Sequence, residues 1–352
     1  MLAELYYPTE PIFPEQLDDY LERGWFRMGQ SIFTTNFLKF NGVFYSAIWL
    51  RVDLLTFTPT KTQQKIKKQN AKFRVEIVPT SPDLSPEQLI LFNKYKSSVP
   101  FDTSPSLSHL LYDNGYSNVY DSYEICVYDH QKLIACGIID LGKNSSEGIV
   151  CFYDPDYKKY SLGKYLMLLK IEFCKKRGMG FFYPGYFAPN YPMFDYKLDL
   201  SDSSMEFLEL STNQWQSISN FVPTETPLII MTQRLEELSE CLKKRNFEHT
   251  FMHYEYFDAD IAQSLNGLGL FDFPVFIFCF EVGISITNPL IIYDIVSSQY
   301  HLVLCDTAYR LDNQIQKENV FNSHLLQMTQ HLFATESMEA MALVVAKSLQ
   351  KV

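Results

Sequence analysis

The stretch YDPDYKKYSLGKYLMLLKIEFCKKRGMGFFYPGYF, residues 153–187, decides the fold class. An acidic turn leads into a Ser-Leu-Gly step, a helix is predicted over 162–177, Gly178 ends that helix, and an apolar strand follows. Three apolar runs separated by turn residues lead up to the helix, at 118–129, 131–142 and 148–156. We therefore expect an antiparallel meander that continues into a strand–loop–helix–strand unit, which makes the fold class α+β.

This order of elements is typical of acyltransferases of the GNAT type, in which the loop before the helix meets the phosphates of the donor. We expect two such mixed-sheet halves and an additional C-terminal α/β domain. The 352 residues are enough for two or three domains. The predicted units are an N-terminal transferase domain at 1–80, a GNAT-like transferase domain at 81–222 and an acidic C-terminal extension at 223–352.

The C-terminal extension differs from the rest of the chain in its pattern of apolar and charged residues. Apolar runs predict strands at 271–286, 288–296 and 301–309, whereas 323–333 and 337–352 have the pattern of closing helices. The function of this extension is not indicated by any motif in it.

Charge is unevenly distributed along the chain, whose formal net charge is -11. Residues 61–74 hold six basic residues and no acidic one, and residues 158–177 hold seven basic residues against Glu172 alone. Residues 202–272 hold twelve acidic and four basic residues. The acidity thus belongs mostly to the C-terminal part, and the N-terminal part can present a basic face to a polyanion. The alternative is a set of solvated helix faces.

Cysteine usage and hydropathy indicate a cytoplasmic protein without a membrane partner. The seven cysteines include no C-x-x-C pair, so we expect buried free thiols and no metal site. The first residues, MLAELYYPTEPIF, lack the pattern of a signal peptide, and no stretch reaches about 18 uninterrupted apolar residues.

Several segments together resemble the aminoacyl-tRNA–protein transferases of the arginyl and leucyl type. They are GWFRMG (24–29), LRV (50–52), FTPTKTQQKIKKQN (57–70), CFYDPDYKKYSLGKYLMLLKIEFCKKRGM (151–179) and FYPGYFAPNYPMFDYK (182–197). Lys61 stands where arginine is usual, and Phe194 stands where methionine is usual. The resemblance covers roughly residues 10–220.

The chain departs from this family at one place. The family carries a C-x-x-C-x-x-C cluster just before the LRV strand, and the corresponding positions here are Asn41, Phe44 and Ala47. No metal or iron–sulfur site carries over, so we expect neither a metal nor a cofactor. Packing of FNGVFYSAIWL (40–50) must replace whatever stability such a site supplies.

The resemblance implies transfer of an amino acid, arginine or leucine, from aminoacyl-tRNA to the α-amino group of an acceptor protein. Acceptors in this family begin with an acidic residue and are tagged for degradation. The implied partners are therefore aminoacyl-tRNA and acceptor proteins with acidic N-termini, and no DNA partner is expected.

The resemblance also suggests residues for binding the two substrates. The positions that match the family's lysine-rich run are candidates for binding the tRNA. The positions in the Ser-Leu-Gly turn, the Gly-Tyr turn and the Tyr-Lys end are candidates for binding the aminoacyl ester, the terminal adenosine and the acceptor. The substrate-binding candidates are Lys61, Gln63, Lys65, Lys68, Asn70, Tyr153, Leu162, Gly163, Tyr165, Gly185, Tyr186, Tyr196 and Lys197. Of these, Lys197 is expected to pair with the acidic side chain of the acceptor.

Four residues are candidates for the chemistry itself. Ser161 sits at a predicted helix N-terminus, where N–H groups favour a developing oxyanion. Asp154, Glu172 and Asp195 are candidates to take a proton or to pair with the acceptor ammonium. The structural alternatives are an ordinary helix cap for Ser161, a turn for Asp154, an ion pair with Lys176 for Glu172, and core packing for the tyrosines.

Two other functions remain open at this point. The first alternative is a catalytically degenerate family member that binds tRNA or protein N-termini without transfer, and the missing cysteines favour it. A small-molecule acyltransferase using coenzyme A is the second alternative, although KKYSLGKY (158–165) has only one glycine where that class uses a basic, glycine-rich phosphate loop.

Overall fold

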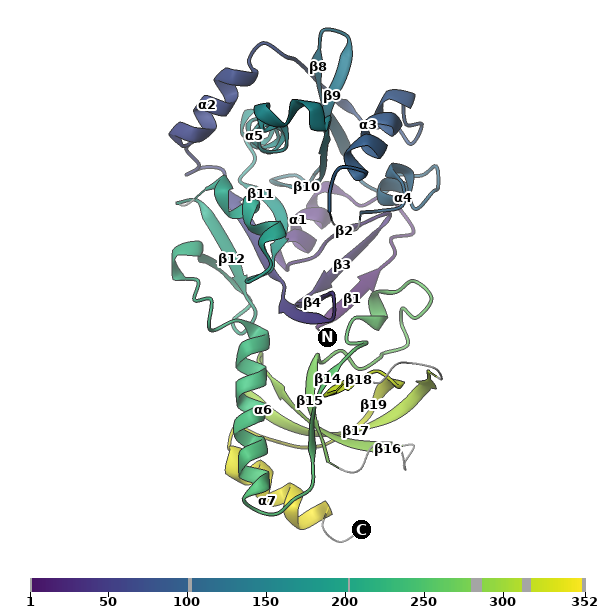
Figure 1. Ribbon diagram of the computed structural model, residues 1–352, viewed down its shortest axis with the longest axis vertical. Coiled ribbons are helices and arrows are strands. Elements are labelled where there is room, and N and C mark those ends of the chain that lie inside the picture. Colours follow the sequence, from purple (N-terminus) through teal and green to yellow (C-terminus); the bar gives the residue numbers. More distant parts are fainter. Residues whose placement is uncertain (1, 101–102, 202, 280–286, 312–317, 350–352) are drawn as a thin grey trace.

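The computed structural model describes residues 2–100, 103–201, 203–279, 287–311 and 318–349. Figure 1 shows a larger upper part and a smaller lower part, with the N-terminus at their junction. The upper part is built on an eight-stranded mixed sheet of order β13-β12-β6-β11-β10-β9-β8-β7. The strands are β6 (Ile48–Asp53), β7 (Arg74–Pro79), β8 (Ser122–Asp129), β9 (Lys132–Leu141), β10 (Ser145–Tyr153), β11 (Phe181–Phe187), β12 (Met205–Glu209) and β13 (Gln214–Ser217).

The predicted meander and the unit that follows it are confirmed. β8, β9 and β10 pair antiparallel, and α5 (Leu162–Lys176) then leads into β11, which lies parallel to β10. α3 (Pro86–Lys96) and α4 (Leu107–Tyr112) connect β7 to β8. This order is that of a GNAT-type half, so the α+β fold class is confirmed.

β10 and β11 separate soon after they begin to pair. Their parallel pairing covers only Ser145–Glu147 against Phe181–Tyr183. The register of β10 against β9 then shifts between Gly148 and Val150, which marks a β-bulge that bends the strand. The two strands therefore leave an opening in the middle of the sheet, and α5 packs against β10 and β9 beside it.

Residues of the first 80 positions complete this sheet rather than forming a separate one. β6 pairs antiparallel with both β11 and β12, and β7 pairs with β8. Smaller elements surround it: a sheet of β1 (Ala3–Tyr6), β3 (Ser31–Thr35) and β2 (Phe26–Met28), a hairpin of β4 (Phe37–Phe40) and β5 (Val43–Ser46), and the helices α1 (Pro14–Glu22) and α2 (Lys61–Asn70). A domain boundary at residue 80 would cut one continuous sheet, and that boundary stays a prediction.

Short 3₁₀ segments join the main elements. η1 (Pro155–Tyr160) precedes α5, η2 (Pro192–Leu200) follows β11, and η3 (Ile218–Asn220) and η4 (Ala259–Ile261) lie in later loops. α2 and α3 begin with complete capping boxes, Thr60 with Gln63 and Ser85 with Gln88, as the Thr/Ser-x-x-Gln patterns indicate.

The lower part is built on a six-stranded sheet, and Figure 1 shows α6 (Pro227–Lys243) and α7 (Met338–Leu349) beside it. α6 packs against α7 and against the sheet, whose order is β18-β14-β15-β16-β17-β19. The strands are β14 (Thr250–Tyr254), β15 (Val275–Phe278), β16 (Thr287–Asp294), β17 (Gln299–Arg310), β18 (Val320–Phe321) and β19 (His324–Thr335). The predicted strand at 271–286 extends into residues 280–286, which lie outside the described residues.

The prediction of a helix at 323–333 is wrong. The segment forms β19, which pairs with β17 along nearly its whole length. The leucines and methionine of SHLLQMTQHLF also fit a helical spacing, but the edge of β17 supplies backbone hydrogen-bond partners along one side of an extended strand. Tertiary pairing thus overrides local pattern here.

The two parts share a continuous contact. Phe37 packs edge-on against Phe257, the Ser46 hydroxyl accepts a hydrogen bond from the Leu228 N–H at 3.0 Å, and Lys39 forms an ion pair with Glu255. All seven cysteines are free, and all of them except the half-buried Cys151 are buried. None of the helices in the described ranges is long and apolar enough to cross a membrane.

Candidate functional site

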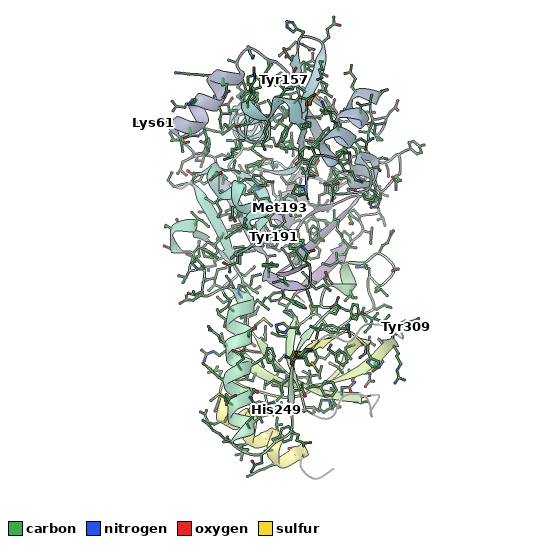
Figure 2. The ribbon with its side chains drawn as sticks, in the orientation of Figure 1. Lys61, Tyr157, Tyr191, Met193, His249 and Tyr309 are labelled. Atoms are coloured by element: carbon green, nitrogen blue, oxygen red, sulfur yellow. The ribbon has the colours of Figure 1, made fainter. Side chains whose placement is uncertain are left out.

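A cavity of about 220 Å³ lies where β10 and β11 separate. Its walls come from β2, β3, β10 and α5, from the second half of β11 and from η2. Figure 2 labels Tyr191 and Met193 at the start of η2, in the middle of the upper part. The lining is Phe26, Arg27, Phe33, Gly148, Ile149, Val150, Cys151, Met167, Lys170, Pro184, Gly185, Tyr186, Phe194, Tyr196 and Lys197.

Lys197 is a buried cation in this cavity without a carboxylate partner among the described residues. Its Nζ donates a hydrogen bond to the Tyr186 carbonyl at 2.6 Å and lies over the rings of Tyr186 and Phe194, at 5.2 and 5.0 Å from their centres. Burial lowers the pKa of Lys197 to about 7, because the charged form loses its hydration and gains no opposing charge. The side chain is therefore partly neutral near pH 7.

Lys170 is the second buried lysine in the cavity. It lies on α5 with no exposed surface, and its Nζ donates a hydrogen bond to the Val150 carbonyl at 3.0 Å. As for Lys197, the part of the chain that the structure describes offers it no ion pair.

Two glycines keep the ends of these lysines free. Gly185 has φ +85°, and a Cβ there would lie 3.2 Å from the Nζ of Lys197. At Gly148, a Cβ would lie 2.8 Å from the ring of Phe182 and 3.6 Å from the Nζ of Lys170. A side chain at Gly185 is thus excluded both by backbone conformation and by crowding.

Aromatic residues surround the ammonium groups. The ring of Tyr186 packs edge-on against Trp49 and Phe194, with centres 5.2 and 5.4 Å away, and burial raises its pKa to about 12. Tyr196 remains 44% exposed, yet burial of its hydroxyl, with Cys151 and Tyr95 close by, raises its pKa. Tyr186, Tyr196, Gly185 and Lys197, all predicted substrate contacts, therefore meet at one cavity.

The Ser-Leu-Gly turn lies about one helical turn before the part of α5 that lines the cavity. Ser161 is exposed, has the left-handed conformation at φ 52°, and makes no side-chain capping bond. The first intrahelical donor is the Tyr165 N–H, which bonds the Ser161 carbonyl at 3.0 Å, so the N–H groups of Leu162 and Gly163 precede the helical ladder. An ordinary cap does not explain Ser161, and its catalytic role stays a prediction.

The other predicted residues in and around this turn are buried or pack against neighbouring side chains. Leu162 is fully buried, and a Cβ at Gly163 would lie 3.3 Å from the ring of Tyr153. Tyr153 in turn packs against Tyr95, with ring centres 5.2 Å apart. Burial raises the pKa of Tyr165, which is 6% exposed, and the nearby Glu172 carboxylate adds to that effect. None of these four lines the cavity.

The three predicted acids lie outside the cavity lining. Asp154 is buried and ion-paired with Lys94 at 2.5 Å and Lys132 at 2.7 Å. Burial opposes its charge, but these two lysines outweigh burial and lower the pKa of Asp154 to about 2, which makes it a poor base at neutral pH. Glu172 forms an ion pair with Lys67 across α5 and α2, and Asp195 lies exposed on η2.

α2 carries the predicted tRNA contacts in two layers. Lys61, Lys65 and Lys68 are exposed, and Figure 2 shows Lys61 at the outer edge of the upper part. Gln63 is buried and donates to the Asp199 and Leu200 carbonyls, and Asn70 is buried and donates to the Ile66 and Tyr160 carbonyls. The two amides hold α2 against η1 and η2, so their geometry fits a positioning role for the exposed lysines.

Packing occupies the positions of the missing cysteine cluster. Ala47 is buried, and the ring of Phe44 lies 5.7 Å from Phe257 and 5.1 Å from His253. The hairpin thus contributes to the apolar core it shares with the lower part.

Sequence reasoning did not find Lys170, Arg27 or Gly148 as parts of this site. Lys170 lies among Leu166, Met167, Ile171 and Cys174, the buried positions of α5, and a lysine on the apolar face of a helix is a signal that can be recognised. Arg27, which lines the cavity, pairs with the buried Asp140 at 3.0 Å, and this pairing joins segments that are distant in the sequence.

Comparisons with known proteins agree with the motifs. Residues 87–206 match the family model described as "Arginine-tRNA-protein transferase, C terminus". An aspartate/glutamate leucyltransferase of Campylobacter jejuni (strain 81-176) is 28% identical over 195 residues, which cover 53% of this chain and 78% of that protein. One from Leptospira interrogans (strain Fiocruz L1-130) is 27% identical over 222 residues, which cover 61% of this chain and 84% of that protein.

Solved structures are similar only at a low level. The L-PGS structure from Bacillus licheniformis aligns with a TM-score of 0.31 at 14% identity, covering 52% of each chain. A tandem GNAT protein from the clavulanic acid biosynthesis pathway aligns with a TM-score of 0.30 at 10% identity, covering 56% of this chain and 58% of that one. The family model, the curated relatives and the order of the motifs together support the aminoacyl-tRNA–protein transferase family for this chain, and the relatives are named as aminoacyltransferases.

Proposed function

We propose that this protein transfers an amino acid from aminoacyl-tRNA to the α-amino group of proteins that begin with an acidic residue, and so marks them for degradation. The observation that carries the proposal is the convergence of Gly185, Tyr186, Tyr196 and Lys197 on the cavity between β10 and β11. These residues belong to the two family motifs that follow α5, and the cavity is the opening of the acyltransferase sheet.

The proposed donor is leucyl-tRNA, with arginyl-tRNA as the alternative. The curated relatives are named aspartate/glutamate leucyltransferases, whereas the matching family model carries the arginine name. The relatives align with this chain over most of their own length, whereas the family model matches only 120 residues. The names of the relatives therefore carry more weight for the choice of donor.

The reaction needs little beyond positioning. The acceptor nitrogen attacks the ester carbonyl, a C–N bond forms, the C–O bond to the tRNA ribose breaks, and the ribose oxygen takes the proton that the amine loses. Roughly a tenth of an α-amino group with a pKa of about 8 is already neutral at pH 7. The ester is activated and both substrates are held together, so proximity supplies most of the rate increase.

The turn before α5 offers a place for the oxygen that becomes negative in this step. The free N–H groups of Leu162 and Gly163 lie at a helix N-terminus, where the dipole favours a negative charge. We propose that Ser161 and these amides stabilise the tetrahedral intermediate.

The tRNA is proposed to lie along the lysine-rich face made by α2 and η1. The exposed Lys61, Lys65 and Lys68 lie on α2, and Lys72 donates a hydrogen bond to the Tyr160 hydroxyl of η1 at 2.8 Å. Phosphate contacts by such lysines give an affinity that falls steeply with salt. Location in the cytoplasm, and the absence of membrane and DNA partners, stay predictions.

The alternative is a binding module of the same family without transfer. Asp154, one of the candidate proton acceptors, is held in ion pairs, and the absent cysteine cluster also favours this alternative. The intact cavity motifs support the enzyme instead.

The test is transfer of radiolabelled leucine or arginine from charged tRNA to peptides beginning with Asp, Glu or Ala. The parent protein is run beside Lys61→Ala and Ser161→Ala. We expect label from leucyl-tRNA on the acidic peptides, with weaker tRNA binding in the first variant and a lower rate at saturating tRNA in the second. No label with salt-sensitive tRNA binding would favour the binding module; no label and no binding would overturn both.

A further inference from the structure

The cavity between β10 and β11 contains two buried lysines and no carboxylate in its lining. Lys170 and Lys197 come from different elements, α5 and η2, and each makes its hydrogen bond to a backbone carbonyl. A buried ammonium is costly unless it is paired, because it loses its hydration. Backbone carbonyls satisfy a hydrogen bond but do not balance the charge.

Other buried cations of the described chain are paired with acids. Arg27 lies 3.0 Å from Asp140, and Arg51 lies 2.6 Å from both Glu22 and Glu206. The cavity lysines depart from this pattern, and they do so at a cavity. An anion that enters the cavity would supply the missing charge.

The surroundings leave room for such an anion at the lysine ends. Gly148 and Gly185, on the two separating strands, present no side chain toward the Nζ atoms. The nearest acid on β10, Glu147, is fully buried, accepts the Arg27 N–H at 3.0 Å and does not line the cavity. Burial first and Asp140 second raise the pKa of Glu147 well above its usual value.

We propose that Lys170 and Lys197 together bind one carboxylate, and that this carboxylate is the side chain of the first residue of the acceptor. The identity of the ligand rests on the proposed function, whereas the preference for an anion rests on the cavity itself. Lys170 is thereby assigned as a specificity-determining residue beside Lys197.

The size and lining of the cavity favour an amino-acid carboxylate over a phosphate group. A volume of about 220 Å³ holds roughly seven waters, which is enough for one side chain and its backbone. Apolar groups from Phe26, Phe33 and Met167 line the rest of the cavity and suit the methylene of an Asp or Glu side chain. Phosphate shares the negative charge, so the test must separate the two anions.

The test measures equilibrium binding of short peptides to the full chain without tRNA. One peptide begins with Asp and the other with Asn, which has nearly the same shape but no charge. The proteins are the parent, Lys170→Met, Lys197→Met and, as control, Lys176→Met, an exposed lysine on the same helix as Lys170. Methionine keeps the length of the side chain, and thermal unfolding verifies that each variant folds. Inorganic phosphate is added as competitor.

We expect the parent to bind the Asp peptide about tenfold or more tightly than the Asn peptide. This preference should disappear in both cavity variants, remain in Lys176→Met, and resist millimolar phosphate. Equal binding of the two peptides by the parent would overturn the proposal, and so would a preference that survives both cavity substitutions. Displacement of the Asp peptide by phosphate would assign the cavity to a phosphate instead. If the preference behaves as expected but no tRNA supports transfer, the proposed function fails and the carboxylate pocket stands.

Discussion

Two pairs of lysines in the upper part are built in opposite ways. Lys94 and Lys132 hold the buried carboxylate of Asp154 between them, and both lysines remain partly exposed. Lys170 and Lys197 are buried themselves and hold no carboxylate of the described chain. The first pair lowers the pKa of Asp154 to about 2, whereas burial alone lowers the pKa of Lys197 to about 7.

The contrast separates structure from function. The charge of the Asp154 carboxylate is balanced by two lysines of the same chain. This cluster therefore fixes the turn of η1 and does not need a ligand to balance its charge. Two cations without an anion are incomplete, and a substrate can complete them. A strongly shifted pKa marks both places, and a cavity adjoins the second place.

The largest expected effect comes from removing both cavity cations. Lys170→Met with Lys197→Met should lower kcat/KM for an Asp-start acceptor by about 100-fold or more, because a buried carboxylate would lose both partners. Filter binding of charged tRNA should change little, since neither residue lies on α2 or η1. Undiminished transfer to the Asp-start acceptor would show that the two pairs do not differ in function.

Removal of Lys197 should increase the stability of the fold, although it decreases activity. Its pKa is lower in the folded state than the unfolded value of about 10.4, so the charged form destabilises the fold fully below pH 7 and progressively less between pH 7 and about 10. Lys197→Met should therefore raise the free energy of unfolding by about 2 kcal/mol at pH 6, with a smaller gain at pH 9. Urea unfolding at both pH values measures this, and a loss of stability at pH 6 would count against an unpaired cation.

Asp154 should show the reverse sign. Its folded pKa of about 2 lies below the unfolded value of about 3.9, so its contribution is present above pH 4 and is lost as the pH falls toward 2. Asp154→Asn should lower the free energy of unfolding by about 1–2 kcal/mol at pH 7, a figure reduced to allow for the exposure of its lysines. Asp156→Asn, at an acid whose side chain is 71% exposed, is the control and should change little. An Asp154 variant as stable as the parent at pH 7 would remove the structural half of the comparison.

The smallest effect is expected for the exposed lysines of α2, which neither hold a buried carboxylate nor lie buried at the cavity. Lys61→Ala should weaken tRNA binding a few-fold and reduce the slope of log affinity against log salt by about one, as expected for one phosphate contact. Nitrocellulose binding between low and moderate salt measures the slope. Lys347→Ala on α7 is a matched control, and equal slopes for the two variants would exclude Lys61 from the tRNA face.

Local patterns predicted the elements around the site well. Gly178 and the run at 162–177 predicted α5, which ends at Lys176, and the Thr-x-x-Gln start of α2 is a true capping box. The pattern at 323–333 failed because a strand partner distant in sequence determined its conformation. The insertion of β6 between β11 and β12 is likewise a pairing that no local pattern contains.

The site was only partly predictable for the same reason. Family motifs pointed to Gly185, Tyr186, Tyr196 and Lys197, which do meet at the cavity. They also pointed to Asp154 and Glu172, which form ion pairs with lysines from other elements. The cavity depends on the separation of β10 and β11, so its second lysine became visible only in three dimensions.

Proton uptake on acceptor binding tests the central claim most directly. An entering carboxylate should raise the pKa of Lys197 from about 7, so at pH 8 the complex takes up a proton that the free protein lacks. Calorimetry of an Asp-start peptide in two buffers of different ionisation heat gives this number, with an Asn-start peptide correcting for the terminal amine. We predict uptake approaching one proton in the parent and none in Lys197→Met. Tight binding of the Asp-start peptide without uptake would contradict the account.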